Sequence, residues 1–210
     1  MTRRLKALGL VLFAVTAMSA ALASAASADP MFHVEMEDTT LTGSQITPNV
    51  LTTDLGELKC EIVHYDGTQG PFTSPTLTLV PTFEKCKIGG VNTSVTTNGC
   101  GFLFHLGHEE NTEAVMDVEC PAGEKLVIHT PGCVITIQPQ NGLQKTTFTN
   151  ENAGATRSLV ADLGVGGIDY VEHGAVCPNE TVTTVNGTLS GQATITGENA
   201  EQLHRGIWVA

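Results

Sequence analysis

Short runs in which apolar and polar residues alternate recur along most of the chain, and this pattern favours β-strands. After residue 28 no stretch places apolar residues at i, i+3, i+4 and i+7 over more than two turns, which is the helical signature. Glycine, asparagine and proline separate the runs. About a dozen short strands with frequent turns predict an all-β protein, an antiparallel β-sandwich or an irregular barrel. The expected strands are 58–62, 76–80, 102–106, 116–118, 126–128, 134–137, 146–149, 158–163, 168–171, 182–185, 193–196 and 206–209.

Turn-forming residues set the expected strand ends. Asp66-Gly67 predicts a turn after the strand at 58–62, and Pro81 predicts the end of the strand at 76–80.

The segment Gly164–Asp169 partly matches a calcium-binding nonapeptide. It lacks one glycine and any tandem copy, and such sites need stacked turns that share cations. A flexible turn is therefore expected there.

The first 28 residues have the features of a secretory signal. Arg3, Arg4 and Lys6 precede an alanine-rich apolar stretch, and Ala26-Ser27-Ala28 forms a cleavage site before Asp29. An uncleaved membrane anchor and a twin-arginine signal are the alternatives. No low-complexity linker divides the remainder, so the sequence predicts a signal peptide at 1–28 and a single secreted β domain at 29–210.

Charge narrows the range of partners. The chain has 22 acidic and 10 basic residues, and cleavage after residue 28 removes three basic residues and no acidic one, which leaves a net charge of −15 with neutral histidines. Such a surface repels nucleic acid and anionic lipid. We therefore expect no nucleic-acid partner and no insertion of the mature chain into a membrane.

Six cysteines follow the export signal, and an even number in an oxidising compartment indicates disulfides. No C-x-x-C pair is present, which argues against zinc binding and redox catalysis. Cys100 and Cys120 share the apolar face of two runs that flank a polar segment. A hairpin centred near residue 110 would place them opposite each other, with Phe104 opposite Met116. Cys60–Cys86 and Cys133–Cys177 complete the simplest pairing.

The densest group of potential metal ligands is His105, His108 and Glu109. A loop could bring two imidazoles and a carboxylate onto one cation. The spacing is not that of a helical zinc motif, however, and a solvated hairpin tip with His105 on the outer face is the simpler interpretation. No cofactor is therefore predicted.

Other chemical signals are weak. Glu37-Asp38 and Glu109-Glu110 supply paired carboxylates of the kind that glycosidases use, but nothing places either pair in a cleft. The single tryptophan, Trp208, lies between Ile207 and Val209 and is expected to have a core or edge role rather than to form a sugar platform.

The sequence does not reveal a biochemical activity. The leading hypothesis is a secreted, non-catalytic β-sandwich that binds an unknown partner, or has a structural role, outside the cell or in its envelope. The first alternative is a secreted hydrolase that uses paired carboxylates or a metal bound by histidine. The second is a secreted inhibitor or toxin. A concave pocket with two carboxylates would favour the hydrolase, and a flat polar surface would favour the binding module.

Overall fold

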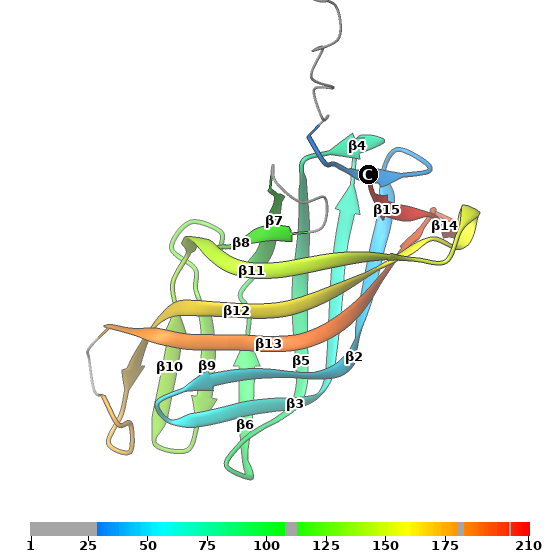
Figure 1. Ribbon diagram of the computed structural model, residues 1–210. Coiled ribbons are helices and arrows are strands. Elements are labelled where there is room, and N and C mark those ends of the chain that lie inside the picture. Colours follow the sequence, from blue (N-terminus) through cyan, green and yellow to red (C-terminus); the bar gives the residue numbers. More distant parts are fainter. Residues whose placement is uncertain (1–28, 108–112, 180–182, 202) are drawn as a thin grey trace, which may run out of the picture.

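The computed structural model describes residues 29–107, 113–179, 183–201 and 203–210, and it is built almost entirely from strands (Figure 1). One 3-10 helix, Gly154–Thr156, is present in this part of the chain. The all-β prediction is confirmed. The strands are β1 (Phe32–Val34), β2 (Thr39–Thr53), β3 (Gly56–Gln69), β4 (Thr73–Ser74), β5 (Thr76–Ile88), β6 (Val91–Thr96), β7 (Gly101–Leu106), β8 (Glu113–Glu119), β9 (Leu126–Thr130), β10 (Cys133–Ile137), β11 (Gln140–Glu151), β12 (Ser158–His173), β13 (Thr183–Glu198), β14 (His204–Arg205) and β15 (Ile207–Val209).

The main sheet closes on itself. Its twelve strands follow the order β14-β13-β2-β3-β5-β6-β9-β10-β12-β11-β8-β7, and two further pairings, β13 with β12 and β5 with β7, join strands that are distant in this order. All of the pairings are antiparallel. In Figure 1, β11, β12 and β13 run across the front, whereas β5, β6, β9 and β10 run upright behind them. The result is a sandwich of two crossing layers.

Two long strands change partners along their length and thereby join the two halves of the sandwich. The start of β5, Thr76–Leu79, pairs with β7, and its end, Cys86–Ile88, pairs with β6. In the same way β12 pairs first with β11 and then with β10. Strands of 13 and 16 residues are needed to span both halves, which is why they exceed the short runs that the sequence predicts.

The predicted strand end at Pro81 is wrong, because β5 continues to Ile88. Pro81 lies opposite Tyr65 of β3, in the stretch of β5 between its contacts with β7 and with β6. Among the described strands, that stretch has a neighbour on one edge only. Such an edge is where a sheet tolerates a residue without an N–H group.

The predicted turn at Asp66-Gly67 is also wrong, because both residues lie inside β3. Gly67 is opposite Leu41 on one side and Leu79 on the other. A β-carbon at Gly67 would lie 2.5 Å from the carbonyl oxygen of Thr78. The glycine is therefore required by the close approach of a neighbouring strand.

The segment Gly164–Asp169 does not form the expected flexible turn, because it lies within β12. The register with β13 shifts between Gly166 and Ile168, and Gly167 has a φ of 74°. The glycines therefore form a bulge in a continuous strand, where an extra residue is accommodated.

The strands β3 and β5 reverse their inward face together at one corner of the sandwich. In β3 the buried positions change from Leu58 and Cys60 to Val63 and Tyr65, so that Ile62, which was expected beside Cys60, is only half-buried. The neighbouring β5 shows the corresponding change near Lys85, whose φ is 53°. Irregular backbone of this kind lets strands bend from one layer into the other.

Three disulfides join the pairs that the sequence predicts, Cys60–Cys86, Cys100–Cys120 and Cys133–Cys177. Cys60 and Cys86 are directly opposite each other in β3 and β5, with Cα atoms 3.9 Å apart. The hairpin of β7 and β8 has the expected register, with Phe104 opposite Met116. The third bridge holds the segment that follows β12 against the start of β10.

A small second sheet, in the order β15-β1-β4, covers one end of the core. Phe32 of β1 is fully buried and makes an edge-to-face contact with Phe148, which makes another with Phe104. The small sheet thus closes the apolar interior near the C-terminus (Figure 1). In the residues that the structure describes, no helix is long and apolar enough to cross a membrane.

Candidate functional site

The structure places His105 on the outer face of β7, as the sequence predicts, and gives it a carboxylate partner. Its Nε2 lies 2.9 Å from Oδ2 of Asp117 on β8. The imidazole is 42% exposed and the Asp117 side chain is 14% exposed. The other oxygen of Asp117 accepts a hydrogen bond of 2.7 Å from the backbone N–H of Gly142. Asp117 therefore fixes the orientation of an accessible imidazole.

The other two candidate metal ligands, His108 and Glu109, lie outside the described residues. Within the described part of the chain, one set of three potential ligand atoms lies within 4.8 Å of one another, in Cys133, Glu172 and Cys177. The two sulfur atoms are joined in a disulfide. In the oxidised protein they are not available as thiolate ligands.

Glu172 is a fully buried carboxylate to which no sequence pattern points. Its Oε2 accepts a hydrogen bond of 3.2 Å from the backbone N–H of Asn179, and its Oε1 has no hydrogen-bond partner in the described part of the chain. Nearby, the backbone N–H of Asp54 donates to the Tyr170 hydroxyl at 2.7 Å. Burial is the main cause that raises the pKa of Tyr170.

Asp54 connects this end of the sandwich to two asparagines. Its carboxylate accepts hydrogen bonds from the side-chain amides of Asn179 and Asn186, the second at 3.1 Å. These bonds hold the segment after β12 against the tip of the β2–β3 hairpin. Asp54 and the two asparagines bond to one another, so we assign these three residues a structural role.

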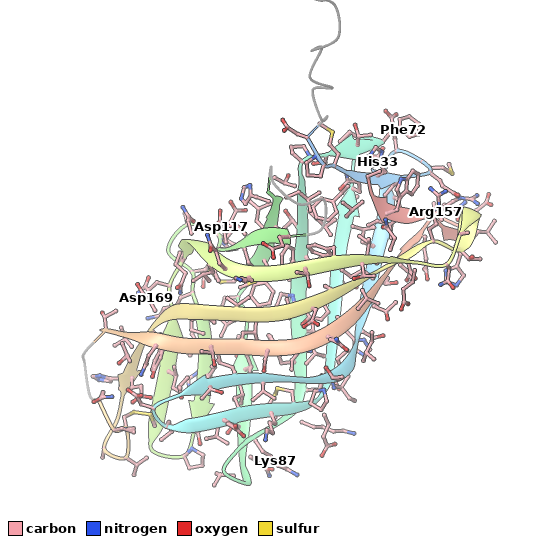
Figure 2. The ribbon with its side chains drawn as sticks, in the orientation of Figure 1. His33, Phe72, Lys87, Asp117, Arg157 and Asp169 are labelled. Carbon is pink, nitrogen blue, oxygen red and sulfur yellow. A yellow bond between two sulfur atoms is a disulfide. The ribbon has the colours of Figure 1, made fainter. Side chains whose placement is uncertain are left out.

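Trp208 has the predicted edge role, in contact with two neighbours. Its ring stacks on His33 of β1, with centroids 5.3 Å apart and planes 9° from parallel. The guanidinium carbon of Arg157 lies 4.6 Å from the indole centroid. His33 and Arg157 are labelled near the small sheet in Figure 2. Because His33 stacks on the indole and Arg157 lies close to it, Trp208 is poorly placed to stack on a sugar ring.

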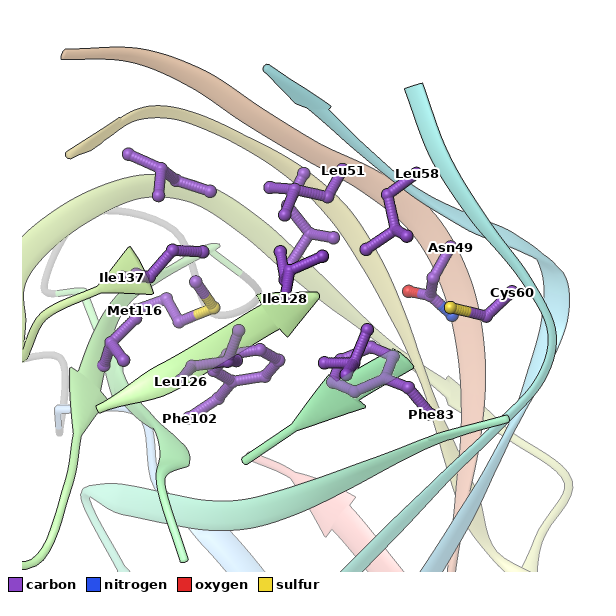
Figure 3. A pocket seen from close by; sticks show the side chains of 14 residues that line it. Asn49, Leu51, Leu58, Cys60, Phe83, Phe102, Met116, Leu126, Ile128 and Ile137 are labelled. Atoms are coloured by element: carbon purple, nitrogen blue, oxygen red, sulfur yellow. The ribbon is translucent and has the colours of Figure 1, made fainter. Parts of the chain in front are cut away.

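The interior contains a narrow apolar cavity of about 40 Å³ (Figure 3). Its walls include Phe102, Met116 and Ile128, with Asn49 at one side. Pockets for drug-sized ligands measure about 300–1,000 Å³. This cavity is too small for such a ligand without movement of the sheet.

Threonine and serine side chains recur in rows on the outer face of the main sheet, with Val160 and His64 between them. One row of directly paired residues crosses six strands, from β11 through β12, β13, β2 and β3 to β5. Its members are Thr149, Val160, Thr194, Ser44, His64 and Thr82. In the next row Thr196 faces Thr42, with their Oγ1 atoms 3.1 Å apart.

The two rows border a shallow depression of about 280 Å³, which we call the hydroxyl groove. It is lined by Thr42, Gly43, Ser44, His64, Thr194 and Thr196. The sequence signal for this surface was the repeated T-x-T pattern at 40–42 and 194–196. The alternating pattern predicts a strand at 193–196 and none at 40–42, where the structure has β2, and the sequence does not show that β2 pairs with β13.

Comparison of the chain with models of protein families, with curated protein sequences and with solved structures finds no match.

Proposed function

We propose that the protein is a secreted, non-catalytic β-sandwich that binds a hydroxylated extracellular or cell-envelope polymer at the hydroxyl groove. The observation that carries this proposal is the groove itself, a depression of about 280 Å³ lined by three threonines, a serine and a histidine on the outer face of a closed sheet. Three disulfides are consistent with an oxidising location outside the cell or in its envelope.

The side chains of the groove suit a polymer of sugars. Each hydroxyl both donates and accepts hydrogen bonds, as sugar hydroxyls do. Neighbouring strands lie about 4.8 Å apart, and alternate residues on one strand are about 6.8 Å apart, so the hydroxyls form a regular lattice. Serine and threonine have few rotamers, and the sheet backbone is fixed by its ladders. Little conformational entropy is therefore lost when a ligand binds.

The test is co-sedimentation of the mature protein with cellulose, chitin and purified cell-wall glycan, each with and without a chelator. The informative variant carries Thr42→Val and Ser44→Ala on β2. The matched control carries Thr96→Val and Ser94→Ala at exposed positions of β6, which belongs to the other layer. Loss of two hydroxyls in the groove should weaken retention about tenfold.

The control variant should bind as the wild-type protein does. Equal losses in both variants, or no retention of the wild-type protein on any of the three glycans, would contradict the proposal. Thermal unfolding of both variants separates a loss of binding from a loss of fold.

A hydrolase is the second candidate, and the His105–Asp117 pair favours it. A carboxylate that orients an imidazole is an arrangement that general-base catalysis uses. In the alternative form of this hypothesis, His105 would act with His108 and Glu109 on a bound metal ion. Substitution of His105 by alanine would abolish such an activity, and it should leave binding at the hydroxyl groove unchanged.

A further inference from the structure

A second depression, on the outer face of β3 and the end of β5, gathers positive charge in an otherwise acidic protein. It measures about 570 Å³, and Lys59, Lys85 and Lys87 line it together with Glu57 and Glu61. These are three of the seven basic residues in 29–210. We call this depression the lysine groove; Lys87 is labelled near it in Figure 2.

The lysine groove carries one more positive than negative charge, and two of its lysines are directly opposite each other. Lys59 and Lys87 are directly opposite each other on neighbouring strands, and like charges at such positions destabilise a sheet. Glu57 lies 2.6 Å from Lys59, but Glu61 is shared at 3.9 Å from Lys85 and 3.7 Å from Lys87. Three ammonium groups thus face two carboxylates, with a local excess of one positive charge.

The backbone also holds one of the lysines in an uncommon conformation. Lys85 has a φ of 53°, in the region that favours glycine, and the ladder of β3 and β5 skips its position between Cys86 and Glu84. A lysine at such a position costs stability relative to glycine. Beneath it, the Cys60–Cys86 bridge fixes the two strands.

The rim of the groove is open on one side. Gly89 and Gly90 form the turn between β5 and β6, and a β-carbon at either position would have no atom within 4 Å. The side chains of the three lysines are 49–63% exposed. Each ammonium group has three N–H donors, so donors are left for a ligand after the ion pairs are made.

From these observations we infer that the lysine groove binds a small dianion of the phosphate type. A phosphate dianion between Lys59 and Lys87 would separate their like charges and would accept hydrogen bonds from both, because it has several acceptor oxygens. The net charge of −15 repels long polyanions, but at physiological ionic strength charges farther away than about 8 Å are screened. The electrostatic attraction of a small anion to the groove therefore depends mainly on the nearby lysines.

The inference is tested by titrating the mature protein with inorganic phosphate at pH 8 and low ionic strength, followed by the NMR shifts of backbone amides. Saturable shifts centred on Gly56, Lys85 and Gly89 are expected. The variant Lys59→Gln with Lys87→Gln should bind about tenfold more weakly. The control variant, Lys125→Gln with Lys145→Gln, has the same net charge and should bind as the wild-type protein does.

Non-specific attraction of phosphate to positive charge would lower the affinity equally in the two double variants, and that result would overturn the proposal. The absence of saturation in the wild-type protein would overturn it as well. Acetate serves as the monoanion probe, and a response as strong as that to phosphate would contradict the preference for a dianion. A further variant, Lys85→Gly, should raise the melting temperature and weaken phosphate binding together. Unchanged binding in Lys85→Gly would exclude a site made of three lysines.

Discussion

Single buried polar residues fix the corner at which the strands bend. Tyr65 is 3% exposed, and its hydroxyl donates a 3.0 Å hydrogen bond to Oδ1 of Asn49. The backbone N–H of Asn49 donates to Gln45, whose side-chain amide donates to the carbonyl of Glu61 at 2.7 Å. This chain of bonds links β2 to β3 where the register between them shifts. The sequence alone does not predict these hydrogen bonds, because the register shift decides which residues of β2 and β3 are neighbours.

Replacement of Tyr65 by phenylalanine should lower the free energy of unfolding by about 1–3 kcal/mol, because the buried Asn49 oxygen loses its donor. Urea unfolding monitored by circular dichroism measures the change. A loss below about 0.5 kcal/mol would show that Asn49 finds another donor, and the corner would then not depend on this bond.

Burial also raises the pKa of Tyr65 above its ordinary value of about 10, and the hydrogen bond to Asn49 opposes this more weakly. The folded state thus favours the neutral phenol. Its contribution is fully present below pH 10 and is lost as the pH rises toward the raised pKa. Urea unfolding between pH 8 and 11 should show a decline above pH 10 that is shallower in Tyr65→Phe. Some decline should persist in the variant, because the pKa of Tyr170 is raised as well.

At the scale of single elements, the hairpin of β7 and β8 was predictable and the path of β3 was not. Cys100, Phe104 and Met116 occupy alternate positions that face the same buried side of the hairpin. The alternation of apolar and polar residues was therefore enough to predict the register of β7 and β8. In contrast, Asp66-Gly67 resembles a turn, and only the approach of β5 shows why glycine is needed in a strand.

Gly67→Ala should therefore destabilise the protein by about 1–3 kcal/mol, through a clash with the carbonyl oxygen of Thr78. Gly166→Ala is the matched control, because its β-carbon would have no atom within 4 Å. Thermal unfolding of the two variants compares them. Equal melting temperatures would mean that β3 and β5 can separate at this point at little cost.

At the scale of the whole molecule, the alternation of apolar and polar residues predicted the all-β class. The strand faces and the order of the cysteines along the chain predicted the three disulfides. The closure of the sheet could not be predicted, because it depends on pairings between distant segments, such as β2 with β13. The hydroxyl groove is a product of those pairings, so its residues were missed as a site. Of the three candidate metal ligands, the structure describes His105, whereas His108 and Glu109 lie outside the described residues.

The disulfides should carry much of the stability of the whole molecule. Removal of the Cys100–Cys120 bridge by a double substitution to alanine should cost about 2–5 kcal/mol. Urea unfolding measures the loss, and non-reducing peptide mapping of the wild-type protein checks the pair. A fragment that links Cys100 to Cys86 or to Cys133 would contradict the hairpin register.

Export is also a property of the whole chain. Cleavage after Ala28 should give a secreted protein that begins at Asp29, because small residues at Ala26 and Ala28 fit the peptidase. Intact mass measurement of the secreted form checks this. A final product that still contains Arg3 would contradict both the proposed location and the net charge of −15.

The most direct test of the central claim, binding without catalysis, follows the polymer as well as the protein. The mature protein is incubated with the glycan that retains it, and bound protein and newly released reducing ends are measured in the same sample. The account predicts saturable, reversible retention with no more reducing ends than in buffer alone. Release of reducing ends that grows with protein concentration and disappears in His105→Ala would contradict it and establish a hydrolase.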